Sequence, residues 1–214
     1  MTYYNDFNSP VAACFLDASK AFDRVNHWRL FQKLLDRDVP LSIVRILLYW
    51  YRHQDVCVRW GKSTSDSFRV TNGVRQGSLI SPKLFSLYVD DLSERLNSSN
   101  IGCFINDVCT NHLYYADDLC ILSPSPMGLQ KLLNLCQDYG DENDISFNPS
   151  KSQYVVFKKR TCKLKFPDVL LKESPVSRVD CCKYLGVLFS QDLNDEAEMK
   201  KNSVVTCMLA VTLS

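Results

Sequence analysis

The sequence Tyr115-Ala116-Asp117-Asp118 places two adjacent carboxylates between two apolar runs. The alternating residues on either side indicate a strand, a tight turn and a second strand, with both acids at the turn. Like charges a few ångströms apart repel and raise each other's pKa, and a bound divalent cation relieves that repulsion. The pair therefore predicts a metal site.

A third carboxylate, Asp17, follows the apolar run Val11–Leu16, which indicates a buried strand. Three acids on neighbouring strand ends suit two-metal phosphoryl transfer. In that chemistry one ion activates the attacking oxygen and the other steadies the leaving oxygen, about 3.5–4 Å away. We therefore predict that Asp17, Asp117 and Asp118 are metal ligands at a catalytic site.

A second tetrad, Tyr88-Val89-Asp90-Asp91, competes for this assignment. It falls inside a helix that Ser81-Pro82 is expected to cap and begin. Consecutive helical residues point about 100° apart, so these two acids cannot converge on one ion. An Asp-Asp pair in a turn is also common without any function, because Asp favours turns. The prediction that Asp117-Asp118 is a functional pair therefore depends on Asp17 and on one further segment.

That segment is Gly73-Val74-Arg75-Gln76-Gly77-Ser78. Its glycines permit close approach of the backbone to a ligand. Arg75 and Gln76 supply donors suited to phosphate or sugar oxygens. A plain loop before a helix would look the same, so this segment alone leaves both interpretations open.

The spacing of apolar residues predicts an α+β fold, with a sheet backed by helices. Pro40 is expected to open a largely buried helix, and Gly140 to close another. The expected helices are 26–36, 40–52, a helix from Ser81 through Leu96, and 129–139. The expected strands are 11–16, 56–60, 68–71, the strands flanking Asp117-Asp118, 145–147, 153–157, 163–166 and 184–189.

Composition narrows the class of protein. The chain has 214 residues, 46% of them hydrophobic and 23% charged, which argues against intrinsic disorder. No membrane span or signal peptide is evident, so we expect a cytoplasmic or nuclear protein that is not secreted. The ten cysteines are scattered and are expected to be reduced, and the three histidines lack the spacing of a zinc site.

The net charge of +1 is weak for a nucleic-acid binder, but the charge is unevenly distributed. Residues 151–172 carry seven cations and one anion, interleaved with aromatic residues. Such a stretch could lie along a phosphate backbone. A solvated hairpin face would have the same composition.

Together these segments resemble reverse transcriptases of non-LTR (LINE-type) retrotransposons, from about residue 11 to about residue 190. Five blocks occur in the family's order, which is far more specific than any one of them. The blocks are Phe15–His27, Gly73–Phe85, Tyr115–Asp118, Ile145–Lys151 and Lys183–Val187.

The resemblance implies a polymerase palm, an antiparallel sheet backed by helices, over residues 1–190. It implies an RNA-directed DNA polymerase that joins a primer 3′-hydroxyl to a deoxynucleoside triphosphate. Asp17, Asp117 and Asp118, with the backbone carbonyl of Ala18, would hold two Mg²⁺ ions, with Mn²⁺ as a substitute. The implied partners are an RNA template, a DNA primer and deoxynucleotides, with no membrane.

The resemblance also implies roles in substrate binding. Phe22 would abut the sugar and exclude a ribose 2′-hydroxyl. Gln76 and Gly77, beside Arg75, would line the pocket for nucleotide and template. Lys151 would lie near the departing pyrophosphate.

The chain departs from the family at both ends. The fingers region before the first block is largely missing, and residues 191–214 look like a truncated or aberrant start of the thumb. A non-catalytic remnant, or a nucleic-acid-binding fragment of a degraded retroelement, is therefore the alternative. An RNA-dependent RNA polymerase or a group II intron-type enzyme is a weaker alternative. Phe22 disfavours ribonucleotides, and Leu79–Pro82 together with Tyr88–Leu92 resembles the LINE-type pattern more closely.

Overall fold

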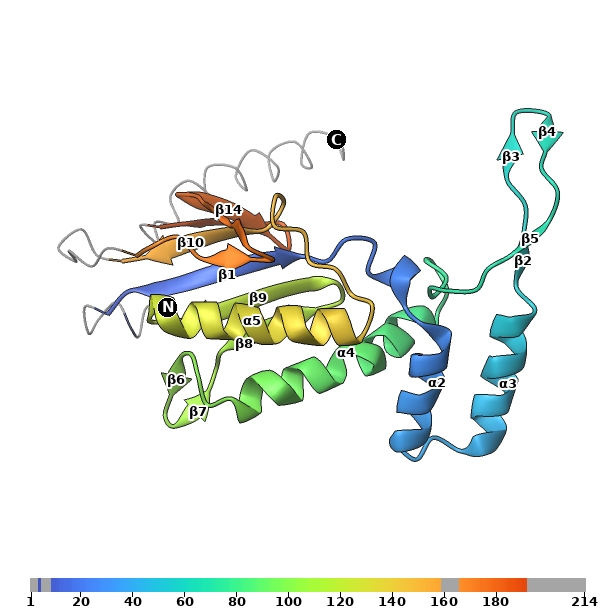
Figure 1. Ribbon diagram of the computed structural model, residues 1–214, viewed down its shortest axis with the longest axis horizontal. Helices are drawn as coiled ribbons and strands as arrows, with labels where there is room; N and C mark the ends of the chain where they lie inside the picture. Colours follow the sequence, from blue (N-terminus) through green and yellow to red (C-terminus); the bar gives the residue numbers. More distant parts are fainter. Residues whose placement is uncertain (1–3, 5–8, 159–165, 192–214) are drawn as a thin grey trace, which may run out of the picture.

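The structure, a computed structural model, describes residue 4, residues 9–158 and residues 166–191. Their central feature is a sheet in the order β13-β10-β1-β9-β8 (Figure 1). Neighbouring strands are antiparallel except β10 and β13. The bounds are β1 Val11–Asp17, β8 His112–Tyr115, β9 Asp118–Ser123, β10 Gln153–Phe157 and β13 Ser177–Arg178.

Helices α4 and α5 pack on one face of this sheet (Figure 1). α2 packs on α4, and α3 packs on α2. The short helix η1 lies between β1 and α2. The bounds are η1 Phe22–Arg24, α2 His27–Asp36, α3 Leu41–Arg52, α4 Ser81–Ser98 and α5 Pro126–Glu142. The predicted α+β class, with a largely antiparallel sheet backed by helices, is confirmed.

The other face of the sheet is covered by the hairpin β14 (Cys181–Tyr184) and β15 (Val187–Ser190). β1 is therefore buried on both sides, with Ala12, Cys14 and Leu16 in one core and Val11, Ala13 and Phe15 in the other. The remaining strands form short two-stranded ribbons. They are β2 Asp55–Val56, β3 Arg59–Trp60, β4 Ser63–Thr64, β5 Phe68–Arg69, β6 Phe104–Ile105, β7 Val108–Cys109, β11 Leu170–Leu171 and β12 Ser174–Pro175.

The expectation that the second helix is largely buried is wrong. α3 buries only Val44, Leu47 and Tyr51. Ile46 and Trp50 are more than 60% exposed on another side. The reason is that α3 packs mainly against α2, which covers one arc of its surface.

Two helix boundaries differ from the prediction. Ile80, not Ser81, is the N-cap residue of α4, and Ser81 is its first helical residue. α5 continues past Gly140 to Glu142. At Gly140 the Ile145 carbonyl oxygen would lie 2.5 Å from an added Cβ, so this glycine serves close packing rather than termination.

Three strand predictions also need comment. Residues 184–189 form part of the β14–β15 hairpin, because Leu185 and Gly186 adopt positive φ values of 49° and 83° and turn the chain. Residues 145–147 contribute a single bridge, between Phe147 and Ala18. The strand at 163–166 lies almost entirely outside the described residues, as does the 192–214 part of the predicted thumb segment.

The eight described cysteines are free, and burial raises the pKa of Cys14, Cys120 and Cys136 far above the ordinary value. Within the described ranges, no helix has the length and apolar character to cross a membrane.

The competing tetrad lies in α4, as predicted, and its acids make ion pairs. Asp91 accepts hydrogen bonds from Lys33 and from Arg37, the latter at 2.5 Å, while Asp90 lies 3.2 Å from Arg37. Partial burial alone would raise the pKa of Asp91, but the two cations outweigh it and hold the pKa below its ordinary value. These carboxylates therefore join α2 to α4.

Replacing Asp91 with Ala should lower the free energy of unfolding by about 1–2 kcal/mol relative to Asp90→Ala, because Lys33 is nearly buried and would lose its partner. Asp90→Ala is a matched control, since it makes the same change in helix propensity. The depressed pKa of Asp91 stabilises the native state at pH values above about 4, and that contribution is lost as the pH falls through the folded-state pKa. Urea denaturation at neutral pH and at low pH measures both effects. Equal stability of the two variants would contradict the proposed ion-pair contribution.

Candidate active site

Asp17 and Asp118 are direct partners in the β1–β9 pairing. Residues directly opposite each other on antiparallel strands project to the same face, with Cβ atoms about 4.5–5.5 Å apart. The structure thus brings together two carboxylates that are separated by about a hundred residues in the sequence. Asp117 immediately precedes Asp118 and lies in the turn that joins β8 to β9.

The turn itself is a two-residue connection. Tyr115 pairs with Asp118, so Ala116 and Asp117 form the tip. Ala116 has a positive φ of 54°, a conformation that two-residue hairpin turns require and that costs a non-glycine residue energy. A strained turn thus holds Asp117 at the end of the β8–β9 pairing, next to β1.

The end of β1 is fixed by a segment from much later in the chain. The Asp17 backbone N–H donates to the Ser152 hydroxyl at 3.2 Å, and the Asp17 carbonyl accepts from the Asn148 N–H at 2.9 Å. Ala18 forms its bridge with Phe147 next to these bonds. Lys151 is exposed and directly precedes Ser152, the residue whose hydroxyl binds the Asp17 backbone.

Electrostatics supports the closeness of the three acids. Partial burial and then the negative charges of Asp117 and Asp17 raise the pKa of Asp118 above its ordinary value. Within the part of the chain that the structure describes, no three His, Cys, Asp or Glu side chains converge tightly enough to enclose one metal ion. The arrangement is therefore a pair of facing carboxylates with a third beside it, a donor set of hard oxygens that suits Mg²⁺.

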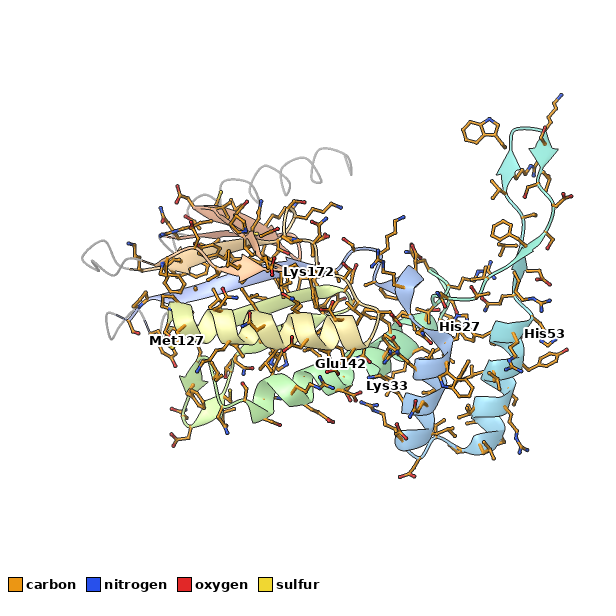
Figure 2. The ribbon with its side chains drawn as sticks, viewed as in Figure 1. His27, Lys33, His53, Met127, Glu142 and Lys172 are labelled. Atoms are coloured by element: carbon orange, nitrogen blue, oxygen red, sulfur yellow. The ribbon has the colours of Figure 1, made fainter. Side chains whose placement is uncertain are left out.

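The loop 73–77 docks on the segment that follows β1. The Val74 N–H donates to the Phe22 carbonyl at 2.8 Å, and the Gly73 N–H donates to the Val25 carbonyl at 2.7 Å. The imidazole Nε2 of His27, at the start of α2 (Figure 2), lies 2.7 Å from the Gly73 carbonyl oxygen. Gly73 has a φ of +88°, and a Cβ there would lie 2.8 Å from the Asp23 carbonyl oxygen. Only glycine fits this position without strain.

A cavity of about 310 Å³ lies between this loop, η1, the start of α4 and the turn. It joins three predicted substrate-binding residues to a predicted metal ligand. Its lining residues are Phe22, Gln76, Gly77, Ser81, Pro82 and Asp117. The other predicted site residues are not among those that line the cavity. They are the two paired carboxylates Asp17 and Asp118, and Ala18, Lys151 and the exposed Arg75.

Two contributors to the cavity were not predicted from the sequence as site residues. Ser81 and Pro82 were interpreted only as a helix start, although they lie within the same block as Gln76 and Gly77. Phe85, one turn further along α4, stacks on the Phe22 ring with centroids 4.5 Å apart and an interplanar angle of 16°. Phe85 is buried, so it fixes the ring that lines the cavity.

Residues 4–189 match the family described as "Reverse transcriptase (RNA-dependent DNA polymerase)". The chain is 31% identical over 182 residues to the Pol polyprotein of the type-2 retrotransposable element R2DM of Drosophila melanogaster, and 30% identical over 185 residues to the probable RNA-directed DNA polymerase of its X-element. These alignments cover 82% and 84% of this chain but only 17% and 19% of the relatives, so the chain spans under one fifth of their length.

Among solved structures, apo telomerase from Candida tropicalis is similar with a TM-score of 0.63 at 12% identity. The match covers 90% of this chain and 36% of the telomerase chain. A second telomerase structure from the same organism, in complex with the TWJ fragment of telomeric RNA, has a TM-score of 0.59 and 11% identity. At such low identity this likeness concerns the fold alone.

Gly73→Ala should lower the free energy of unfolding by about 3 kcal/mol, since a Cβ would both strain the backbone and strike Asp23. Gly77→Ala is the control. Gly77 also has a positive φ, of 79°, but a Cβ there would meet no atom within 4 Å, so the loss should be about 1 kcal/mol. Denaturant melts measure the difference. A Gly77 variant as unstable as the Gly73 variant would contradict the close-packing explanation.

Asp118→Asn should stabilise the protein in metal-free buffer, because it removes repulsion from Asp17 and Asp117. The raised pKa of Asp118 means that the native state holds its proton more tightly. The contribution of Asp118 to the free energy of unfolding should therefore fall as the pH rises above about 4, and the difference in stability between the variant and the wild type should grow over the same range. Mg²⁺ should raise the melting temperature of the wild type more than that of the variant. Thermal melts in EDTA and in Mg²⁺ test both points, and identical pH profiles would contradict the charge coupling.

Proposed function

This chain belongs to the reverse transcriptase family, and we propose that it carries the polymerising site of an RNA-directed DNA polymerase, a nucleotidyltransferase of a non-LTR retrotransposon. The observation that carries the proposal is the direct pairing of Asp17 with Asp118, beside Asp117 at the edge of the cavity that Phe22 and Gln76 line. Family membership indicates the reaction class, and the closeness of the three carboxylates to the cavity supports this location for the reaction. The palm-type fold is the scaffold on which that site is built.

Reverse transcriptases generally use divalent metal ions. We propose two Mg²⁺ ions here, held by the carboxylates of Asp17, Asp117 and Asp118 with the Ala18 carbonyl. When bound, the ions would activate a primer 3′-hydroxyl and stabilise charge on the transferring phosphate. Partial burial and then the negative charges of Asp117 and Asp17 raise the pKa of Asp118, which supports this role because a bound cation would stabilise the ionised carboxylates.

The remaining residues would position the nucleotide. Phe22 would meet the sugar, and its ring cannot tilt away freely because Phe85 stacks on it. Gln76 and Gly77 would line the base and template side of the same cavity. Glycine at position 77 leaves open space where a Cβ would project, which lets a substrate approach the backbone.

Arg75 and Lys151 are proposed as cationic partners of the phosphates. Both side chains are exposed, and neither belongs to an ion pair within the described residues. Arg75 follows the docked Gly73-Val74 segment, while Lys151 adjoins Ser152, which binds the Asp17 backbone. Each is thus a cation without a carboxylate partner among the described residues; Arg75 follows a segment anchored to η1 and the residues after it, and Lys151 precedes the residue that binds Asp17. The proposed partners are an RNA template, a DNA primer and deoxynucleoside triphosphates.

The test is extension of a DNA primer on an RNA template by the purified chain with Mg²⁺ or Mn²⁺. Asp117→Asn should lower the rate by at least about a hundredfold, because it removes a negatively charged ligand from the reacting centre. Asp90→Asn changes the competing tetrad by the same chemistry and should leave the rate unchanged.

The outcomes separate the two candidate functions. Extension that survives Asp117→Asn would refute the assigned site. Binding of nucleic acid without extension on any template would favour the second candidate, a non-catalytic nucleic-acid-binding fragment.

A further inference from the structure

The segment Asp55–Arg69, here called the arm, leaves the body of the protein after α3 as a two-stranded ribbon (Figure 1). β2 pairs with β5 at its base, and β3 pairs with β4 at its tip. Every residue of the arm is exposed. An isolated hairpin gains little stability from packing, so the arm contributes side chains to a surface rather than to the core.

The tip of the arm presents an aromatic side chain. Trp60 is 86% exposed, the most exposed tryptophan in the chain. Residues two apart on a strand share a face, so Val58 and Trp60 lie on one side of β3 and its approach. Gly61, with a φ of +60°, begins the two-residue turn that reverses the chain immediately after the indole. A flat, accessible ring at the end of a projecting ribbon is a stacking surface.

Two cations flank this ring. Arg59 precedes Trp60, and Lys62 lies in the turn after it. Across the described ranges, neither side chain is paired with a carboxylate, and the side-chain bond found for Arg59 is a long one, 3.4 Å, to the Gly61 carbonyl. Arg69 at the base of the arm differs, because Asp55 lies 3.2 Å from it. Neither cation at the tip therefore takes part in an ion pair within the described residues.

An exposed aromatic ring between two unpaired cations favours some classes of ligand over others. A polypeptide that covered the ring would have to desolvate two unpaired cations or provide acids for both. A single strand of nucleic acid carries alternating phosphates and accessible base faces, which match cations on either side of an aromatic ring. A duplex fits less well, because its base faces are stacked on one another.

We propose that the arm tip, Arg59 to Lys62, binds single-stranded nucleic acid, with Trp60 stacked on a base and Arg59 and Lys62 on the neighbouring phosphates. The proposal goes beyond the polymerising site and rests on the proposed function only for the expectation that nucleic acid reaches this protein. The arm lies beyond the end of the sheet toward which β1 runs (Figure 1). That is the end carrying Asp17, so one strand could extend from the cavity toward the arm.

The experiment measures binding of the whole chain to a fluorescein-labelled single-stranded RNA of about 16 nucleotides, in EDTA so that no reaction occurs. The double variant Arg59→Gln/Lys62→Gln is compared with Arg45→Gln/Lys131→Gln, which removes the same charge from exposed positions on α3 and α5. Trp60→Ala is compared with Trp28→Ala, since Trp28 is 73% exposed on α2.

Trp60→Ala should weaken binding about tenfold, and Trp28→Ala should not. The arm double variant should reduce the slope of log affinity against log salt by roughly 1.4, the value for two lost phosphate contacts on a single strand. Quenching of tryptophan fluorescence by RNA should persist in Trp28→Phe and disappear in Trp60→Phe.

Equal losses in the arm and control variants would overturn the proposal, as would unchanged binding in all of them. Self-association that Trp60→Ala abolishes, with RNA affinity unchanged, would assign the arm to polypeptide contacts and overturn it as well. Failure of the polymerase proposal is separable. It would appear as a wild type that never extends a primer, while the arm variants would still differ from their controls in RNA binding.

Discussion

The facing of Asp17 and Asp118 is the constraint on which the rest of the molecule depends, because two carboxylates on adjacent strands repel and must be held together by something else. The register of β1 against β9 does this. A shift of one residue would carry Ala12, Cys14 and Leu16 to the opposite core and exchange them with Ala13 and Phe15. Since both faces of β1 are buried, that exchange would disturb two cores at once. The free energy of hydrophobic packing on both faces of β1 therefore offsets the electrostatic repulsion between the two carboxylates.

Backbone contacts from distant segments then limit how far the carboxylates can move. Ser152 and Asn148 bind the backbone of Asp17 on one side of β1. On β9, the Tyr184 hydroxyl donates to the Asp118 carbonyl at 3.3 Å, and the Tyr184 ring packs on Phe15 with centroids 5.1 Å apart. Each of the two acids is thus held through its main chain, which leaves both side chains available to a ligand. A site that must bind cations needs this division between fixed backbone and free carboxylates.

The sequence alone predicts the parts of this arrangement that local pattern controls. The buried strand before Asp17 and the hairpin that carries Asp117 and Asp118 follow from apolar runs and turn chemistry, although Asp118 lies in β9 and only Asp117 lies in the turn. The helical context of Asp90-Asp91 follows from the spacing in α4. Local sequence pattern does not predict which other elements these helices and strands pack against. The apolar residues of α3 indicate a helix but do not reveal that α2 covers one arc of it. Likewise Gly140 has the composition of a helix end, and only the approach of the Ile145 carbonyl explains why it lies inside one. The stacking of Phe85 on Phe22 joins two residues that are more than sixty positions apart in the sequence, and no spacing rule brings them together.

The sheet and the region of α3 and the arm differ in how much apolar surface they bury. The sheet side buries its apolar residues against α4, α5 and the β14–β15 hairpin, while the α3 side leaves Ile46, Trp50 and the arm exposed. Reaction chemistry demands carboxylates held to a fraction of an ångström, and a doubly covered sheet can meet that demand. Contact with a nucleic-acid strand of varying sequence demands the opposite, a projecting element whose ring and cations adjust to whichever base arrives. The proposed polymerising site and the proposed contact at the arm could meet both demands in one chain. The arm shares no core with β1, so its movements need not disturb the register that holds the carboxylates together.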